Sequence, residues 1–284
     1  MASYFISDLH LSSARPQLTA ALQQFLAGTL STGDRLYILG DLFDVWVGDD
    51  ALDACAHQVA AALGQCQQRG IQLFFIHGNR DFLLGKRFAR AASMQLLPEA
   101  TVIDLYGCPT LLMHGDSLCT QDLAYMAFRS KSRSWWWPRL VLLTPRSYRL
   151  KRAAAYRAHS QMAKQSKSAA IMDVTLEEVR RLMAEHQVQR LIHGHTHRPA
   201  CHQVSLPQGC SSNWLSLNVE LCNCSFTERV DQLRFNKRPT NCGSVVLKCG
   251  QDLHSLFRQK ILPIQREHLP GLHDAAFQTT QFIG

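Results

Sequence analysis

The residues of this 284-residue chain that could do chemistry begin with a short run, residues 193–199, of sequence His-Gly-His-Thr-His-Arg-Pro. His195 and His197 stand two positions apart, with Gly194 before them, directly after an apolar run that ends at Ile192. Two imidazoles on such a turn can reach one point in space, and imidazole is a ligand that suits Mn, Fe and Zn. The run therefore predicts a metal site whose other ligands come from elsewhere in the chain.

Four further blocks carry Asp, His or Asn directly after an apolar stretch. In chain order they are Asp8-Leu9-His10, Gly40-Asp41-Leu42-Phe43-Asp44, Gly78-Asn79-Arg80-Asp81 and His114-Gly115-Asp116. One strand-end Asp is by itself more often a cap or a turn former. Five blocks in order favour a shared site, because the carboxyl ends of parallel strands meet at one edge of an α/β sheet. Together they offer enough oxygen and imidazole ligands for two ions that share a carboxylate.

The elements that must position these blocks alternate between strand-like and helix-like patterns. We expect strands at 3–7, 35–39, 71–76, 101–106, 109–113 and 190–192, and helices at 16–30, 52–69, 82–92 and 173–185. Short connections between alternating strands and helices predict parallel strands with helices packed on them. The fold class is therefore α/β.

The alternation is interrupted at residues 121–168, where Pro138 and Pro145 divide two or three expected helices. Residues 123–172 hold eleven Lys and Arg and no acidic residue, whereas the net charge of the whole chain is only +8. Three consecutive tryptophans, residues 135–137, lie in this basic segment. Such a mixture is typical of a surface that meets anionic headgroups. The alternative is a small helical subdomain that buries its tryptophans in a core of its own.

Composition narrows the class of protein. Apolar residues make up 46% and charged residues 18% of the chain, which is typical of a globular protein. No apolar stretch reaches the roughly 18 residues of a membrane span. The chain begins on a strand, so we expect no signal peptide and a cytosolic protein. Its ten cysteines include no CxxC pair, so no structural zinc site is expected. In a cytosolic chain disulfides are not expected either.

The five blocks together resemble the signature of the calcineurin-like metallophosphoesterases, namely DxH, GDxxD, GNH(D/E), an isolated His before Gly, and GHxH. The resemblance implies a four-layer α/β/β/α sandwich, here with a helical lid insertion at 121–168. It also implies seven residues that are both catalytic and metal ligands. One ion would be held by Asp8, His10, Asp41 and His197, and the other by Asp41, Asn79, His114 and His195. Asp44 and Asp81 would orient ligating imidazoles or their loops.

Arg80 departs from the common family pattern, because many relatives carry a histidine there that can protonate a leaving alkoxide. Arginine stays charged and cannot be that acid, but it can clamp a phosphate bidentately. Two metal ions activate a water for in-line attack on phosphorus and neutralise the developing charge. A phosphate leaving group, whose last pKa is about 6, needs no proton. We therefore expect a metal-dependent pyrophosphatase.

Residues 78–81, 116–125 and 194–199 resemble most the members of the family that act on UDP-2,3-diacylglucosamine in lipid A biosynthesis. This resemblance implies attack at the α-phosphorus, giving UMP and 2,3-diacylglucosamine 1-phosphate, with two Mn²⁺ ions per subunit. It implies a peripheral protein on the cytoplasmic face of the inner membrane, without nucleic acid or an obligate protein partner. The substrate contacts it implies are Asn79, Arg80, Asp122, Tyr125, Ser160, Lys164, Lys167 and His195.

The resemblance ends near residue 203, so we expect a metallophosphoesterase domain at 1–204 and a divergent, Cys-rich segment at 205–284. Only 244–247 is typical of a strand in that segment. The change in composition just after an intact motif suggests a frameshifted or divergent C-terminal part. Two other functions stay open. One is a metal-dependent nuclease or nucleotide phosphodiesterase, which the basic and aromatic segment favours. The other is a catalytically impaired homologue with a disrupted C-terminal part.

Overall fold

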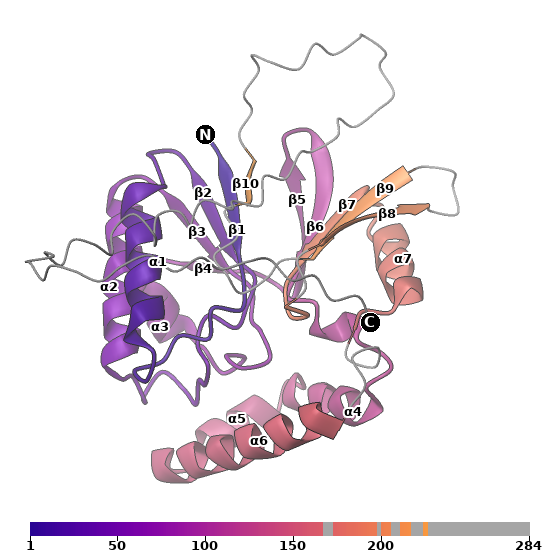
Figure 1. The fold of residues 1–284 in the computed structure, drawn as a ribbon. Coiled ribbons are helices and arrows are strands. Elements are labelled where there is room, and N and C mark those ends of the chain that lie inside the picture. Colours follow the sequence, from indigo (N-terminus) through magenta and orange to yellow (C-terminus); the bar gives the residue numbers. More distant parts are fainter. Residues whose placement is uncertain (167–172, 198–199, 206–210, 217–223, 227–284) are drawn as a thin grey trace, which may run out of the picture. The chain divides into compact units, whose positions relative to one another are not determined.

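The structure is a computed structural model that describes residues 1–166, 173–197, 200–205, 211–216 and 224–226 (Figure 1). All of them belong to one compact unit. The strands are β1 (Ser3–Ile6), β2 (Arg35–Ile38), β3 (Gln72–Phe75), β4 (Gln95–Leu96), β5 (Ala100–Leu105), β6 (Cys108–Met113), β7 (Arg190–His193), β8 (Ala200–Ser205), β9 (Ser211–Ser216) and β10 (Cys224–Phe226). The helices are α1 (Pro16–Gly28), α2 (Ala54–Gln68), α3 (Lys86–Ala91), α4 (Leu123–Ser132), α5 (Trp137–Leu142), α6 (Arg146–Ser166) and α7 (Leu176–Glu185), with a short 3-10 helix, η1 (Asp116–Leu118).

The described strands form two sheets. The first has the order β10-β1-β2-β3-β4, in which β1 to β4 are parallel and β10 is antiparallel. The second has the order β5-β6-β7-β9-β8, with β6, β7 and β9 parallel. The register pairs Ile6 with Ile38 and Ile38 with Phe75, so the loops after β1, β2 and β3 leave the first sheet at one edge.

Apolar clusters of described residues show the four layers. Helices α1, α2 and α3 pack on the first sheet through side chains that include Leu22, Leu63 and Phe88. Phe5 and Ile192 belong to a cluster between the two sheets, and the outer face of the second sheet packs against α7. Each fully buried side chain of this kind contributes roughly 1.5–3 kcal/mol. The expected α/β/β/α sandwich is confirmed, and Figure 1 shows its layers side by side.

Three features differ from the expectations. Helix α3 begins at Lys86 rather than at residue 82, because the Asp49 carboxylate accepts hydrogen bonds from the backbone N–H groups of Gly85 and Phe88. Strands β4 and β8 were not expected. Strands β9 and β10 lie past residue 204, where only 244–247, outside the described residues, was expected as a strand.

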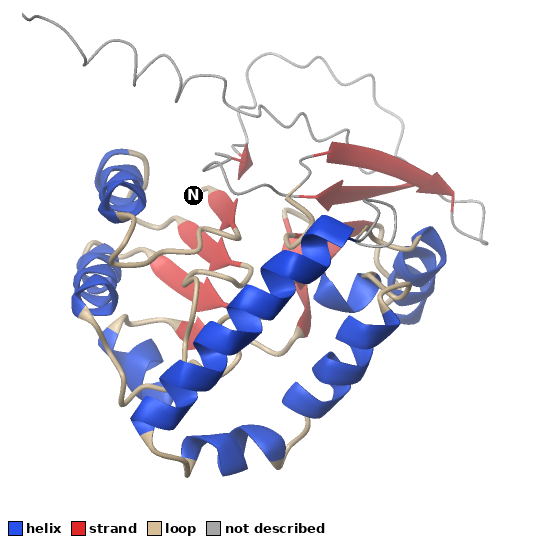
Figure 2. Ribbon diagram, turned by 60° about the horizontal axis from the view of Figure 1, so that its bottom comes forward, coloured by secondary structure: helices blue, strands red, loops and turns tan. Residues whose placement is uncertain are grey.

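Helices α4, α5 and α6 lie in the segment 121–168, called the insertion below, and Figure 2 brings α6 to the front. Pro138 lies in the first turn of α5 and Pro145 directly precedes α6, the positions where a missing N–H costs least. Arg149 and Arg157 of α6 form ion pairs with Asp50 and Asp44, which belong to the chain that follows β2. Of the helices described, none has the length and apolar character that a membrane span requires.

Candidate metal centre

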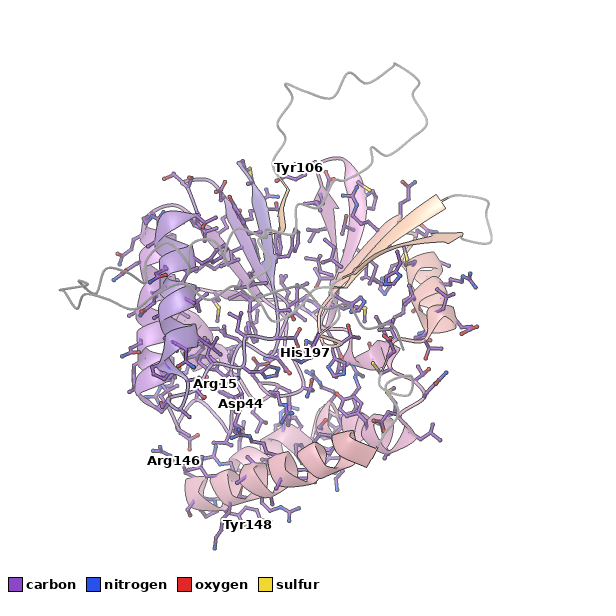
Figure 3. All side chains as sticks on the ribbon, in the orientation of Figure 1. Arg15, Asp44, Tyr106, Arg146, Tyr148 and His197 are labelled. Atoms are coloured by element: carbon purple, nitrogen blue, oxygen red, sulfur yellow. The ribbon has the colours of Figure 1, made fainter. Side chains whose placement is uncertain are left out.

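The seven candidate ligands follow the strands at one edge of the two sheets. Asp8 and His10 follow β1, Asp41 follows β2, Asn79 follows β3, His114 follows β6, and His195 and His197 follow β7. Figure 3 labels His197 and Asp44 between the ends of the strands and helix α6. The sheet topology therefore brings together all the residues that the five sequence blocks predict.

Five of these residues have left-handed backbones, which is rare outside glycine. The φ angles are 58° at Asp8, 48° at His10, 53° at Asp41, 73° at His195 and 54° at His197. Each such conformation costs on the order of 1–3 kcal/mol and persists only where neighbouring contacts hold it. The backbone N–H groups of Asp8 and His10 donate to the carbonyls of Gly40 and Asp41, at 3.0 and 2.9 Å. The strain is concentrated at the candidate centre.

Two motif glycines are required by close approach. A Cβ atom at Gly78 would overlap the Asp41 carboxylate, and one at Gly194 would overlap the side chains of Ser7 and Asp8. The glycines in these blocks therefore let the polar loops pack directly on the ligand carboxylates.

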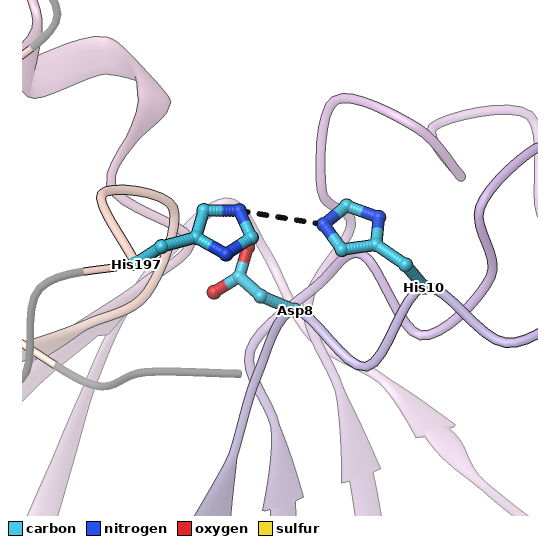
Figure 4. Close-up of side chains that lie close together, drawn as sticks. All are labelled: Asp8, His10 and His197. Carbon is cyan, nitrogen blue, oxygen red and sulfur yellow. Dashed lines mark hydrogen bonds between the residues drawn. The ribbon is translucent and has the colours of Figure 1, made fainter. Parts of the chain in front are cut away.

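The first cluster contains Asp8, His10 and His197 (Figure 4). The Nε2 atoms of His10 and His197 lie 3.5 Å apart, with the two rings almost parallel. Asp41 Oδ2 lies 3.8 Å from His10 Nε2. Asp8 Oδ1 is buried and has no hydrogen-bond partner among the described residues. An orphaned buried carboxylate oxygen next to two imidazole nitrogens fits a bound cation.

The second cluster contains His114, Asn79 and His195. Asn79 Oδ1 lies 3.0 Å from both His114 Nε2 and His195 Nδ1, and these two nitrogens are 3.2 Å apart. His114 Nδ1 lies 2.8 Å from the Leu39 carbonyl, which can only accept, so Nδ1 carries the proton. In the neutral ring Nε2 then presents its lone pair to the Asn79 oxygen. Lone pairs that converge in this way fit a cation as well.

Asp41 lies between the two clusters, with Oδ1 3.7 Å from His114 Nε2 and Oδ2 facing His10. Burial raises the pKa of Asp41 to about 8, with further contributions from the carboxylates of Asp81 and Asp8. Burial opposes protonation of His114, but Asp41 and Asp8 outweigh it and raise the His114 pKa. Without a cation these groups therefore retain protons, and a divalent ion would compensate the same negative charge.

Asp81 anchors the loops that carry the ligands, as expected. It is fully buried, and its carboxylate accepts from the backbone N–H groups of Leu42 and Gly78 at 2.8 Å and of Asp41 at 3.3 Å. Asp44 makes a contact that the sequence did not predict. Its carboxylate forms an ion pair with Arg157 of α6, so it ties the insertion to the ligand-bearing loop.

The structure describes the side chains of some candidate substrate contacts but not of others. Arg80 is half-buried, and its backbone N–H donates to Asp41 Oδ1 at 2.8 Å. Asp122 caps α4 by accepting from the N–H of Tyr125. Ser160 and Lys164 fall within α6 in a part whose side chains are not described, and Lys167 lies outside the described residues.

Tyr125 contacts the candidate centre through its ring, whose centroid lies 6.0 Å from that of His195. Its hydroxyl donates to Asp116 Oδ2 at 2.6 Å, and Arg129 Nε donates to the same oxygen at 3.0 Å. Sequence reasoning assigned no role to Asp116, Arg129 or Arg133. The sequence feature that could have identified Asp116 is its position two residues after His114 in the same block.

The three tryptophans of the insertion have different environments. Trp135 is 78% exposed and Trp136 is 40% exposed. Trp137 packs against Phe82 and Phe128, at 5.9 and 6.3 Å between ring centroids. Helix α5 contains no buried residue. The described part of the insertion therefore gives no support to the alternative of a subdomain with a buried tryptophan core.

Most of the chain matches known proteins. The model of the calcineurin-like phosphoesterase family matches residues 1–199. The UDP-2,3-diacylglucosamine hydrolase of Escherichia coli O6:H1 is 53% identical over 204 residues, which are 72% of this chain and 85% of that protein. The protein of the same name from Escherichia fergusonii matches with the same identity and coverage.

Solved structures give weaker matches. A protein of unknown function from Aquifex aeolicus matches with 18% identity and a TM-score of 0.37, over 69% of this chain and 80% of that one. Vacuolar protein sorting 29 from Cryptosporidium parvum matches with 12% identity and a TM-score of 0.37, over 80% of this chain and 77% of that one.

Proposed function

The chain belongs to the calcineurin-like phosphoesterase family, and we propose that it hydrolyses the diphosphate of UDP-2,3-diacylglucosamine to UMP and 2,3-diacylglucosamine 1-phosphate. The observation that carries the proposal is the convergence of Asp8, His10, Asp41, Asn79, His114, His195 and His197 at one sheet edge. We take the substrate from the name of the relatives, which are 53% identical to this chain.

The family implies divalent metal ions, and the donor set suits them. Asp8, His10, Asp41 and His197 would hold one ion, and Asp41, Asn79, His114 and His195 the other. Two such ions supply an activated water and neutralise charge that develops on the phosphoryl oxygens. The mixed oxygen and imidazole donors suit Mn²⁺, which we propose as the metal.

Arg80 sets the kind of leaving group. Its guanidinium stays charged, so it stabilises a phosphate but donates no proton to an alkoxide. A sugar 1-phosphate leaves without protonation, which matches attack at the α-phosphorus of the nucleotide. Asp122, Tyr125, Ser160, Lys164 and Lys167 would complete the substrate contacts beside Asn79, Arg80 and His195.

We also propose that the protein acts on the cytoplasmic face of the inner membrane as a peripheral protein. The insertion exposes Trp135, Leu140 and Leu143 in a segment that is rich in Arg and Lys. Exposed apolar and aromatic side chains beside cations fit an anionic bilayer surface. A substrate with two acyl chains would be presented there.

The proposal is tested by incubating the full chain with Mn²⁺, UDP-2,3-diacylglucosamine and ¹⁸O-labelled water. We expect UMP that carries one ¹⁸O atom, because attack at the α-phosphorus leaves the label on the nucleotide. A label on the sugar phosphate would contradict the site of attack. Single-stranded DNA is the parallel substrate, since the basic segment also fits a nuclease. Cleavage of DNA without cleavage of the lipid would overturn the proposal.

A further inference from the structure

Helix α4 of the insertion reaches the loop that carries Asn79. The Arg133 guanidinium donates to the backbone carbonyl of Gly78 at 2.8 Å and to that of His77 at 3.3 Å. These are the two residues before Asn79. The same guanidinium lies 3.8 Å from Asp116 Oδ2 and 5.8 Å from the centre of the Phe82 ring. Arg133 is therefore held on several sides while it fixes the backbone in front of Asn79.

Asp116 joins this contact to the rest of the insertion. Its side chain is 1% exposed and follows β6 two residues after His114. Besides Arg133, its Oδ2 meets the Tyr125 hydroxyl and Arg129 Nε, and Arg129 also pairs with Glu99. Charge-assisted bonds of this kind, buried from water, define geometry more strongly than exposed ones. The cluster Asp116–Tyr125–Arg129–Arg133 thus ties α4 to the sheet edge.

The contacts of this cluster fall on one side of the candidate centre. Arg133 holds the Asn79 loop, Asp116 follows His114, and the Tyr125 ring packs against His195. Asn79, His114 and His195 are the ligands of one proposed ion. The His10 and His197 pair of the other ion lies beside Asp8 and Asp41. The two halves of the centre therefore depend differently on this cluster.

We propose that Arg133 is a positioning residue that sets the Asn79 loop for the ion held by Asn79, His114 and His195. Docking of α4 and completion of that half of the centre are then one event. The proposal rests on the metal binding in the proposed function, and it needs no assumption about the substrate. Loss of the guanidinium frees the Gly78 carbonyl and lets the Asn79 amide leave its place. The ion held by Asp8, His10, Asp41 and His197 keeps its ligands.

The test is calorimetric titration of the full metal-free chain with Mn²⁺, for the wild type and for Arg133→Gln. We expect two binding events in the wild type. In Arg133→Gln, one affinity should fall by about tenfold to a hundredfold, the usual effect of losing a group that orients a ligand, and the other should stay within about threefold. Arg133→Lys keeps the charge but lacks the planar guanidinium that donates to two carbonyls, so its loss of Mn²⁺ affinity should be intermediate. It also serves as the test variant if Arg133→Gln does not fold.

Arg139→Gln is the matched control, because Arg139 is an exposed arginine of the same insertion that lies over the Trp135 ring. Both of its Mn²⁺ affinities should equal those of the wild type. Two unchanged affinities in Arg133→Gln, or equal losses at both ions, would overturn the inference and leave the proposed function standing. A wild-type chain that binds no Mn²⁺ would overturn the proposed function together with it.

Discussion

The backbone N–H of His195 donates to Asp8 Oδ2 at 2.7 Å, which joins the first and the last metal-site blocks of the chain. Asp8 follows β1 of the first sheet and His195 follows β7 of the second. A ligand of each proposed ion is therefore held by a ligand of the other, across the boundary between the sheets. The bond requires Gly194, which lies against Ser7 and Asp8.

Gly194→Ala should abolish activity with Mn²⁺ and lower the free energy of unfolding. A Cβ atom there would overlap Ser7 Oγ and Asp8 Oδ2, and overpacking of a buried site costs about 1–3 kcal/mol. Denaturant unfolding and the UMP assay measure the two effects. Gly28→Ala is the control, since its Cβ would meet nothing within 4 Å at the end of α1. It should be neutral or slightly stabilising.

Asp81→Asn should destabilise the metal-free protein by about 2–4 kcal/mol, as measured by urea unfolding. Asp81 accepts from backbone N–H groups on two loops, and an amide would turn an NH₂ group towards some of these donors. Asp104→Asn provides the comparison, because Asp104 is exposed and accepts from Gly107 alone in the described contacts. Its effect should stay within about 0.5 kcal/mol. Equal effects of the two changes would refute the anchoring role.

The sequence predicts the strand-end ligands well, because each block follows a buried strand whose apolar pattern is strong. Its resemblance to a family also predicts the layers. Strands β9 and β10 are not predictable in this way. Their sequences, Ser-Ser-Asn-Trp-Leu-Ser and Cys-Ser-Phe, show little apolar pattern. Their strand state depends on pairing with other strands, β9 with β7 and β8 and β10 with β1, which lies at the other end of the described chain.

The contacts of the insertion escape sequence reasoning for a related reason. Arg133, Arg149 and Arg157 are three of eleven basic residues in one segment, and composition alone suggests a solvated cationic surface. The structure gives each of them a partner on the chain after β2 or β3. Which basic side chain turns inward depends on how the helices dock, and no local pattern carries that information.

The metal-free protein should become less stable as the pH rises from about 6.5 to about 8; at lower pH the lowered pKa values of His193 and His77, both caused by burial, act in the opposite direction. The folded chain holds the Asp41 proton more tightly than the unfolded chain, because burial raises the pKa from 3.8 to about 8. Stability from such a proton is complete below the unfolded pKa and is lost as the pH passes through the folded one. The raised pKa of His114 acts in the same direction. Thermal unfolding in a chelator at several pH values measures the slope.

Saturating Mn²⁺ should raise the unfolding temperature most at the high end of this range, because the ion takes the place of the protons. At a concentration a hundred times the Kd, one bound ion adds about 2.7 kcal/mol. Asp41→Asn removes the titrating carboxyl group, so the unfolding temperature of this variant in the chelator should depend less on pH. A wild-type profile that rises with pH in the chelator would contradict the assignment of the Asp41 proton.

Arg149→Ala should loosen the insertion and lower stability by about 1–2 kcal/mol. The guanidinium forms two bonds to the Asp50 carboxylate and one to the Val47 carbonyl, and the side chain is almost fully buried. Limited proteolysis should therefore cut the insertion faster in the variant. Arg181→Ala is matched to it, because Arg181 pairs with Glu178 and Glu185 on the exposed face of α7. Exposed pairs of this kind are worth less than about 1 kcal/mol, so its proteolysis rate should not change.

The exposed apolar side chains of the insertion should govern binding to anionic vesicles. Trp135 and Leu143 are 78% and 82% exposed in a segment that is rich in Arg and Lys, so both can enter a headgroup layer without any change in the fold. The double variant Trp135→Ala/Leu143→Ala should bind at least about tenfold more weakly to vesicles that contain phosphatidylglycerol, since each lost side chain is worth about 1.5 kcal/mol or more. Trp136→Ala should have a smaller effect, because Trp136 is less exposed. Val102→Ala, at an exposed apolar position on β5, should bind like the wild type. Equal binding by the double variant and Val102→Ala in a sedimentation assay would show that the insertion is not the docking surface.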